Sequence, residues 1–571
     1  MMKKLPVFVL VFLLISGLGM TADRYVNVNT GTDDLAAGRG ESPGNPWKTI
    51  GFAVQNSIDN DTINVAAGDY KTSDTGLILI NKPLKLLGPQ ADIDPRPSAG
   101  SSRIPGDNTT EAIMNAQNDM ATILEIAAHG VEVNGFEIKN ATGDMIESNS
   151  GGDWTTATLK CCIMSNAGDE GVQLRDVWHS SIEYNYLFNI AQDGINVSSG
   201  AWDTSIKNNE ITTCNSDNGA IYVYNSYGPI YINDNYIHSC TACNGIKIYE
   251  NYDWAEAEPF YVVNNLIENN NFNGTKYDQD GNAIQLYKPY KMANTNSSIE
   301  ITGNILKNND GNGDDLRQAG HGIYWHQANE VSNNNLPIDI MYNQILDNQG
   351  WGVLFEMNTT ARDPSTTKVK TIHNTFSGNV LGQMSNTSSV YTDGSFNYWG
   401  ASTGPATGDV NGPVVTDPYA FFSPIRQEIP VSGGVVSVDP AVNDRYKNLS
   451  VTIPGLDKVS ACILRTPADR HGVNNAVEIM LDPPATLTAD ATVKIEFTIP
   501  EDEIIGGTWE QMRLAKWDGS QWTVLPDPYT TNKSNWPTEN TVEGPTGSFS
   551  IFGAWPDPGT VPVELSTLSF E

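Results

Sequence analysis

Apolar and polar residues alternate along much of the chain between residues 130 and 400, within a two-part phrase that recurs many times. The first part follows the order apolar-x-x-Asn-x-apolar, as in IEYNYL and INDNYI, and the second follows Gly-apolar-x-apolar-x, as in GVQLR and GIKIY. Alternation with a period of two residues is typical of β-strands, and Gly and Asn mark the turns between them. A repeat that holds several short strands predicts an all-β chain whose centre is a parallel β-solenoid.

The asparagine of the first part returns at one fixed position in each repeat. Its spacing runs from 24 residues (209 − 185) to 39 residues (343 − 304). Asparagines at one buried corner of successive coils can stack into a hydrogen-bonded ladder, so we favour a structural role over a catalytic one. The predicted ladder consists of Asn185, Asn209, Asn235, Asn265, Asn304, Asn343 and Asn374.

Two cysteines offer a check on this register. Cys214 and Cys240 each follow a ladder asparagine by five residues, which predicts that they lie one above the other on adjacent coils. Adjacent strands are about 4.8 Å apart. At that spacing the two side chains either form a disulfide or pack as buried thiols, and the sequence leaves both alternatives open.

The segments outside the repeat predict the other domains. NPWKTIGFAVQNS has helical spacing at Trp47, Ile50, Ala53 and Val54, which predicts a short helix that caps the first coil. Strands such as ATVKIEFTIP, which follow Pro430, predict a separate β-sandwich. The predicted order is a signal peptide (1–22), an N-terminal cap with the first coils (23–128), the main parallel β-helix (129–430), the β-sandwich (431–556) and a tail or linker (557–571).

Charge and hydropathy narrow the class of protein. Lys and Arg number 33 against 67 Asp and Glu, a formal net charge of −34. This excess argues against binding to nucleic acid or to anionic membrane surfaces. The start of the chain is basic, then apolar, then small, as in a secretory signal, and no later segment is apolar enough to span a bilayer. We therefore expect a secreted monomer, extracellular or at the cell surface.

Several phrases near the start of the chain resemble a known family. YVNVNTGTDD, NPWKTIGFAV, DTINVAAGDY and INKPLKLLGP, with FNYWGASTGP at 396–405, resemble secreted right-handed parallel β-helix proteins of the pectate-lyase-like superfamily. The resemblance covers about residues 24–425 and implies that fold. It leaves the activity open, because the superfamily holds lyases, hydrolases, epimerases and non-enzymatic surface proteins. The last residues, VPVELSTLSFE, resemble the segment before further C-terminal modules in type IX secretion cargo, so the chain either stops there or is truncated.

The second part of the phrase predicts which side chains face outward. In GHGIYWHQ at 320–327, Ile323 and Trp325 match the inward pair, so Tyr324 and His326 point outward. The same register gives two exposed rows along the coils. The first row is Gln173, Asn196, Tyr222, Lys247, Gln285, Tyr324 and Leu354. The second row is Arg175, Ser198, Tyr224, Tyr249, Tyr287, His326 and Glu356.

Tyrosines beside Lys and Arg suit the faces and polar edges of sugar rings. The alternative is a tyrosine ladder that only stabilises the sheet by cross-strand stacking. Long loops flank the richest part of the rows and predict the walls of a groove for an extended polymer. The predicted substrate-binding residues are Arg175, Tyr222, Tyr224, Glu250, Tyr324 and Glu356.

Two chemistries compete for this groove. A glycoside hydrolase needs two carboxylates within about 10 Å. Glu250 and Glu356 are three coils apart, about 14 Å. β-Elimination needs a partner for the uronate carboxylate, a base and an acid. We assign Lys247 or Lys288 as the base, Tyr287 or His326 as the acid, and Arg175 or a calcium ion as the carboxylate partner. The predicted catalytic residues are Lys247, Tyr249, Tyr287, Lys288 and His326.

Calcium is the one cofactor that the sequence suggests, and no motif for an organic cofactor is present. Asp278, Asp280, Asp314 and Asp315 lie in long loops and are candidate ligands, against the alternative of solvated acidic loops. The leading prediction is a lyase that cleaves an acidic, uronate-containing polysaccharide. The rival is a non-catalytic adhesive or glycan-binding β-helix, and a glycoside hydrolase or uronate epimerase comes third.

Overall fold

The structure of the protein is a computed structural model. It describes residues 21–71, 73, 76–148, 154–216, 218–241, 244–249, 258–272, 281–287, 298–311, 320–327, 337–357, 369–387, 392–401, 403–420, 423–438, 446–467, 476–497, 512–517, 522–525, 541–546 and 548–556. Within these ranges, no helix is both long and apolar enough to cross a membrane. Of the predicted signal peptide (1–22), residues 1–20 lie outside the described residues.

The chain divides into two compact units, and each is described by itself. The first unit is Met1–Ser298 with Asp310–Gly320, and the second is Ile299–Asn309 with His321–Glu571.

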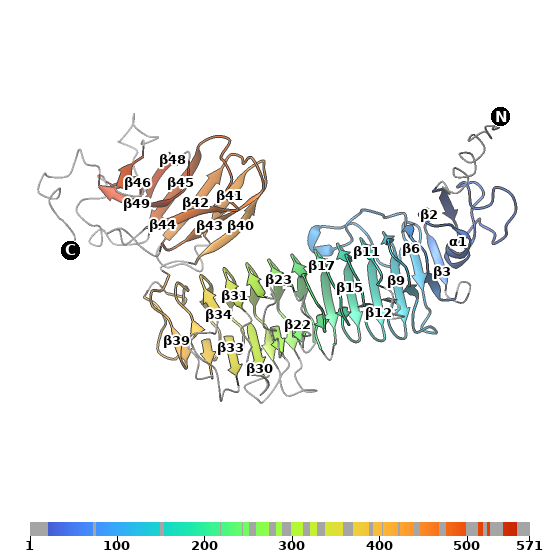
Figure 1. Ribbon diagram of the computed structural model, residues 1–571, viewed down its shortest axis with the longest axis horizontal. Coiled ribbons are helices and arrows are strands. Elements are labelled where there is room, and N and C mark those ends of the chain that lie inside the picture. Colours follow the sequence, from blue (N-terminus) through green and yellow to red (C-terminus); the bar gives the residue numbers. More distant parts are fainter. Residues whose placement is uncertain are drawn as a thin grey trace, which may run out of the picture. The chain divides into compact units, whose positions relative to one another are not determined.

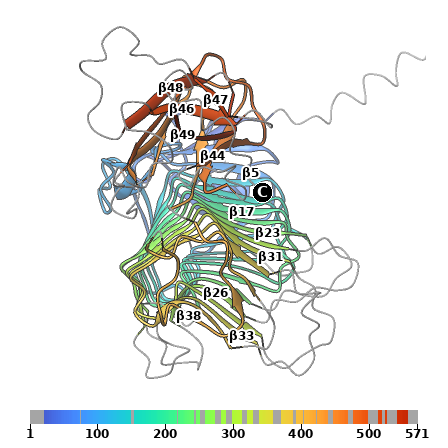
Figure 2. The same ribbon diagram turned by 90° about the vertical axis from the view of Figure 1, so that its left-hand side faces the viewer.

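Three long parallel sheets, of 14, 12 and 11 strands, form the β-helix. One coil of the first unit places one strand in each sheet: β17 (Thr204–Lys207), β18 (Glu210–Cys214) and β19 (Ile221–Tyr224). In Figure 1, β9 (Glu137–Ala141), β12 (Ile163–Ala167) and β15 (Tyr186–Ile190) lie side by side in the 11-stranded sheet. Figure 2 looks along the stack, where β5 (Leu84–Leu87), β17 and β23 (Phe260–Val263) of another sheet follow one another. The predicted parallel β-solenoid is confirmed.

The core of each coil is a set of aliphatic side chains that point inward. In the coil of β17 to β19, Ile206, Ile211, Ile221 and Val223 are each fully buried. Burying such side chains against the coils on either side is the main favourable term in folding a solenoid, because no single coil can cover its own apolar face.

The asparagine ladder is present in both units. In the first, the Asn185 side-chain amide donates to Asn209 Oδ1 at 3.0 Å, and Asn209 donates to Asn235 Oδ1 at 3.0 Å. In the second, Asn304 donates to Asn343 Oδ1 at 2.9 Å. The residue before each ladder asparagine has a left-handed backbone, with φ between 54° and 71° at Tyr184, Asn208, Asp234, Asn264, Gly303, Tyr342 and His373. Such a corner turns the chain sharply and aims the next side chain inward.

The cysteine pair follows the predicted register. β18 pairs with β21 (Tyr236–His238), with Ile211 opposite Ile237, and this register places Cys214 beside Cys240. Both are buried free thiols, so packing is the alternative observed. Burial raises the pKa of the Cys240 thiol to about 12. On the following coil Asn270 takes this position and accepts a hydrogen bond from the Cys240 amide at 2.9 Å.

The predicted cap helix is α1 (Ile50–Asn56). Thr49 caps its N-terminus, because its hydroxyl oxygen accepts a hydrogen bond from the Phe52 amide at 3.3 Å. Ile50, Ala53 and Val54 are buried, as the helical spacing predicted, and Trp47 is buried just before the helix.

The 12-stranded sheet carries the two rows of the candidate site. Its strands are β4 (Ile78–Ile80), β7 (Leu124–Ile126), β10 (Ile146–Ser148), β13 (Val172–Arg175), β16 (Ile195–Ser198), β19, β22 (Asn244–Tyr249), β26 (Asn282–Tyr287), β30 (Ile323–Gln327), β33 (Trp351–Met357), β36 (Gly382–Asn386) and β38 (Val410–Asn411).

Two antiparallel sheets follow the β-helix; apart from β40, their strands lie in the region predicted as a β-sandwich (431–556). The larger contains β40 (Ile425–Ile429), β43 (Ser460–Arg465), β44 (Val477–Asp482), β49 (Ile551–Pro556), β46 (Met512–Trp517) and β47 (Trp522–Val524). The smaller contains β41 (Gly434–Ser437), β42 (Tyr446–Ile453), β45 (Ala491–Phe497) and β48 (Thr541–Thr546). Buried residues of both sheets, such as Leu464 and Val451, form one hydrophobic cluster.

Candidate functional site

The strand register aligns the two predicted rows. In the first unit, Gln173, Asn196, Tyr222, Lys247 and Gln285 pair in succession along β13, β16, β19, β22 and β26. The second row pairs in the same way, in the order Arg175, Ser198, Tyr224, Tyr249 and Tyr287. In the second unit, Tyr324 pairs with Leu354, and His326 pairs with Glu356.

The two rows differ in exposure. The first row was expected to be exposed, and this is wrong for most of it: Lys247 is 5 % exposed, and Gln285 and Tyr324 are fully buried. One contact that buries this row is a hydrogen bond to a buried corner residue, since the Asn244 side-chain amide donates to Gln285 Oε1 at 3.0 Å. In the second row, the side chains of Arg175, Tyr224, Tyr249, Tyr287 and Glu356 are half-buried, whereas Ser198 and His326 are buried.

Lys247 lies beside two stacked tyrosines. The Tyr249 and Tyr287 rings are 4.7 Å apart between centroids and 3° from parallel. Lys247 Nζ is 5.7 Å from the Tyr249 centroid and 5.9 Å from that of Tyr287, both within cation–π range. The structure therefore brings together three of the five predicted catalytic residues.

The tyrosine stack continues onto the preceding coil. The Tyr224 ring lies 5.3 Å from that of Tyr249, and Tyr222 lies 6.0 Å from Tyr224. Such contacts stabilise a sheet by cross-strand packing, and they also leave a row of half-buried ring edges with hydroxyl groups.

A second group of predicted residues meets in the second unit. The Tyr324 hydroxyl donates to Glu356 Oε2 at 2.5 Å. His326 Nδ1 lies 3.2 Å from the Tyr324 hydroxyl oxygen and 3.4 Å from Glu356 Oε2. The strand register of the sequence could place these three near one another, but it did not reveal that a single carboxylate joins them. The corner residue His321 lies beside this group: its ring is 5.8 Å from that of Tyr324 between centroids, and its Nδ1 accepts a hydrogen bond from the Trp351 amide at 2.8 Å.

The remaining predicted residues are not placed. Glu250, Lys288, Asp278, Asp280, Asp314 and Asp315 lie outside the described residues.

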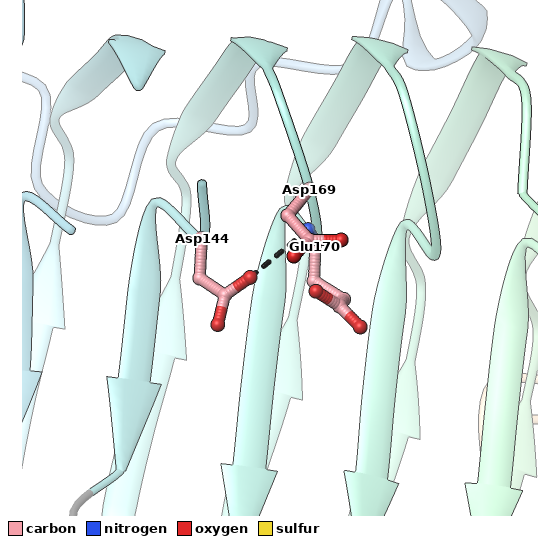
Figure 3. Close-up of side chains that lie close together, drawn as sticks. All are labelled: Asp144, Asp169 and Glu170. Atoms are coloured by element: carbon pink, nitrogen blue, oxygen red, sulfur yellow. Dashed lines mark hydrogen bonds between the residues drawn. The ribbon is translucent and has the colours of Figure 1, made fainter. Parts of the chain in front are cut away.

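Sequence reasoning missed an acidic cluster at a corner of the first unit. One carboxylate oxygen each of Asp144, Asp169 and Glu170 lie within 4.8 Å of one another, the single group of this kind found among the described residues. Figure 3 shows Asp144 facing Glu170, whose backbone amide donates to Asp144 Oδ1 at 3.1 Å. Burial, followed by the hydrogen bond and charge of Asp144, holds the pKa of Glu170 well above its ordinary value. Carboxylates at this spacing favour either a shared proton or a cation.

Asp193 occupies the same corner one coil further. It is fully buried and accepts hydrogen bonds from the Ser216 hydroxyl and from the Asn196 amide, the latter at 2.9 Å. Burial raises the pKa of Asp193 to about 6. The sequence signal was the residue just before each GVQLR-type phrase, which is acidic at Glu170 and Asp193.

One comparison, with family models, agrees with the fold described above. A family model for the right-handed β-helix region matches residues 149–336. No match was found among curated proteins. Two similar solved structures are pectate lyase Pel9A and XylC in complex with xylose. Pel9A has a TM-score of 0.35 and 14 % identity, and the match covers 67 % of this chain and 81 % of Pel9A. XylC has a TM-score of 0.36 and 10 % identity, and the match covers 76 % of this chain and 89 % of XylC. A third is the A-module of the mannuronan C-5 epimerase AlgE4 of Azotobacter vinelandii, with a TM-score of 0.33 and 13 % identity; the match covers 69 % of this chain and 98 % of that module.

Proposed function

We propose that the chain, which is built on a right-handed parallel β-helix, is a secreted polysaccharide lyase. Its substrate is an acidic, uronate-containing polysaccharide. The observation that carries the proposal is Lys247 beside the parallel rings of Tyr249 and Tyr287. An amine and two phenols on adjacent coils supply the groups that move protons during β-elimination.

The proposed reaction breaks the glycosidic C–O bond. A base takes the proton from the carbon next to the carboxylate, and the electron pair of that C–H bond forms the new C=C bond. The leaving oxygen then takes a proton from an acid. Lys247 or Lys288 is the base, Tyr287 or His326 is the acid, and Arg175 or a calcium ion neutralises the carboxylate.

Calcium belongs to this proposal through Asp278, Asp280, Asp314 and Asp315. Four carboxylates offer the oxygen ligands that calcium prefers. A bound calcium ion would supply positive charge for the substrate carboxylate. Removal of calcium from the assay tests this part of the proposal separately from the residues of the two rows.

Glycoside hydrolysis is the second candidate, and the acidic corner favours it. Hydrolysis needs one carboxyl group that keeps its proton and one that is ionised. Glu170, whose pKa is raised, lies beside the second carboxyl group of Asp144. The two candidates are distinguished by their products, because only elimination creates an unsaturated uronate.

The test incubates the chain without its signal peptide against alginate, pectin, glycosaminoglycans and ulvan, with and without calcium. We expect the ultraviolet absorbance of unsaturated uronate to rise, and we expect the rise to vanish in Lys247→Ala or His326→Ala. New reducing ends without ultraviolet absorbance would indicate hydrolysis instead. If neither signal appears, the protein binds or displays glycans and does not cut them, which contradicts the proposal.

A further inference from the structure

A cluster of aromatic rings follows the strands of the first unit where β13, β16 and β19 end. Trp154 and Trp178 lie 4.4 Å apart between ring centroids, and Trp154 lies 6.4 Å from Tyr227. All three side chains are half-buried, so parts of their rings face solvent. None of them belongs to the two rows of the proposed lyase site.

Gly200 connects this aromatic cluster to polar groups. Its φ is +94°, and a Cβ atom there would lie 2.9 Å from the Tyr227 ring and 3.4 Å from Asp176 Oδ1. The Gly200 amide donates to the Asn225 carbonyl oxygen at 2.6 Å. A glycine at this corner therefore lets the Tyr227 ring and the Asp176 carboxylate approach the backbone closely, next to Asn225.

Two buried polar atoms at these corners lack a hydrogen bond. Asn225 is 9 % exposed, and its Oδ1 has no hydrogen-bond partner among the described residues. The same holds for Trp178 Nε1, whose ring stacks in the cluster. A buried polar atom without a partner costs free energy, and a ligand that pairs with it recovers that cost. Both atoms therefore point to a ligand with hydroxyl groups.

We propose that Trp154, Trp178 and Tyr227, with Asp176 and Asn225, form a binding site for a neutral pyranose chain. The rings pack against the C–H faces of the sugar, and the two side-chain oxygens accept hydrogen bonds from its hydroxyl groups. Burial raises the pKa of Asp176, as expected for a carboxylate whose solvation is incomplete.

The chemistry of the site selects neutral sugars over uronates. The Asp176 carboxylate and the Asn225 amide oxygen are both acceptors, so they pair with hydroxyl donors and repel a carboxylate. Arg175, which precedes Asp176, offsets part of this repulsion through its charge. The site binds but does not cut, and it does not depend on the proposed elimination.

The experiment is isothermal titration of the full chain with three neutral probes, cellohexaose, mannohexaose and laminarihexaose, and with hexagalacturonate as the acidic probe. We expect saturable binding of at least one neutral probe and at least tenfold weaker binding, or none, of hexagalacturonate. Tyr227→Ala and Asp176→Asn should each lower the affinity about tenfold. The matched control is Phe188→Ala, which removes a ring stacked on Tyr186 at 4.9 Å on another sheet and should leave the affinity within about twofold.

The outcomes that overturn the proposal are equally defined. They are no saturable binding of any neutral probe, affinities unchanged in both variants, or equal binding of hexagalacturonate. Circular dichroism verifies folding, and if Tyr227→Ala does not fold, Asp176→Asn decides the matter alone, because its shape is conserved. Elimination is assayed in parallel on Tyr227→Ala. Binding of the neutral probes alone decides this proposal, whether or not elimination is detected.

Discussion

Two polar columns run through the same coils of the first unit: the asparagine ladder keeps one residue type, and the first outward row does not. The asparagine ladder repeats one residue with one set of partners: Asn209 and Asn235 each donate their amide to the next ladder oxygen and to a backbone carbonyl. The first outward row changes at every coil, in the order Gln173, Asn196, Tyr222, Lys247 and Gln285.

The constant ladder has a structural role, whereas the variable outward row is where residues with a chemical role can occur in the same repeat. A column that must satisfy the same buried backbone groups on every coil can hold only a residue whose side chain carries both a donor group and an acceptor group in fixed places. A column that faces outward has no such requirement, so its residues are free to differ. A variable residue in a uniform solenoid is therefore the better guide to function, and the predictions below test this contrast.

The largest effect is expected in the ladder. Asn235→Ala removes four side-chain hydrogen bonds: two that Oδ1 accepts from Asn209 and two that Nδ2 donates, to the Ile206 carbonyl and to Asn265. At about 1 kcal/mol each, the free energy of unfolding should fall by about 4 kcal/mol. Denaturant titration measures it. The exposed Asn108 is the matched control, and Asn108→Ala should cost less than about 1 kcal/mol. Equal losses of unfolding free energy in the two variants would contradict a special structural role of the ladder.

The next effect is expected at Lys247. Lys247→Met should lower kcat for elimination about 100-fold to 1000-fold without changing the free energy of unfolding by more than about 1 kcal/mol. Lys247→Arg then defines the role: a proton-transfer role predicts a loss as large as in Lys247→Met, because arginine keeps its proton. If Lys247 instead acts as a fixed positive charge, Lys247→Arg should keep at least one tenth of the wild-type kcat. An active Lys247→Met would remove this residue from the mechanism.

The sequence predicted the register of the coils closely, because a period of two and a fixed corner asparagine leave one way to align the strands. It placed Lys247 beside Tyr222 and His326 beside Glu356, as observed. It failed on exposure: Lys247 lies against the Tyr249 and Tyr287 rings and Tyr324 bonds to Glu356, and a period of two does not encode such contacts. It also missed the acidic corner, whose members Asp144 and Glu170 meet only through stacking of coils.

A smaller effect is expected in the second unit. Tyr324 is fully buried, and its hydroxyl holds Glu356 next to His326, which makes it a positioning residue. Tyr324→Phe should lower kcat about tenfold and leave KM unchanged, because the ring remains and only the hydrogen bond is lost. The matched control is the buried Tyr398 of the same unit, where Tyr398→Phe should not change kcat. A rise in KM alone would instead indicate that Tyr324 binds substrate.

The smallest effect is expected at the acidic corner and depends on pH. The pKa of Glu170 is raised in the folded chain, so its contribution to stability is complete below its ordinary value of 4.5 and is lost as the pH rises above it. Glu170→Gln mimics the protonated form. At pH 8 it should therefore be more stable than the wild type by about 1–2 kcal/mol, after allowance for solvent screening of a half-buried group, with no difference at pH 4. Thermal unfolding across this range measures the effect.

Asp169→Asn, at the exposed member of the cluster, is the control and should give a smaller gain in stability at pH 8. Parallel pH profiles for Glu170→Gln and the wild type would show that Glu170 is ionised in the folded chain, as expected where a cation, rather than a proton, balances the cluster.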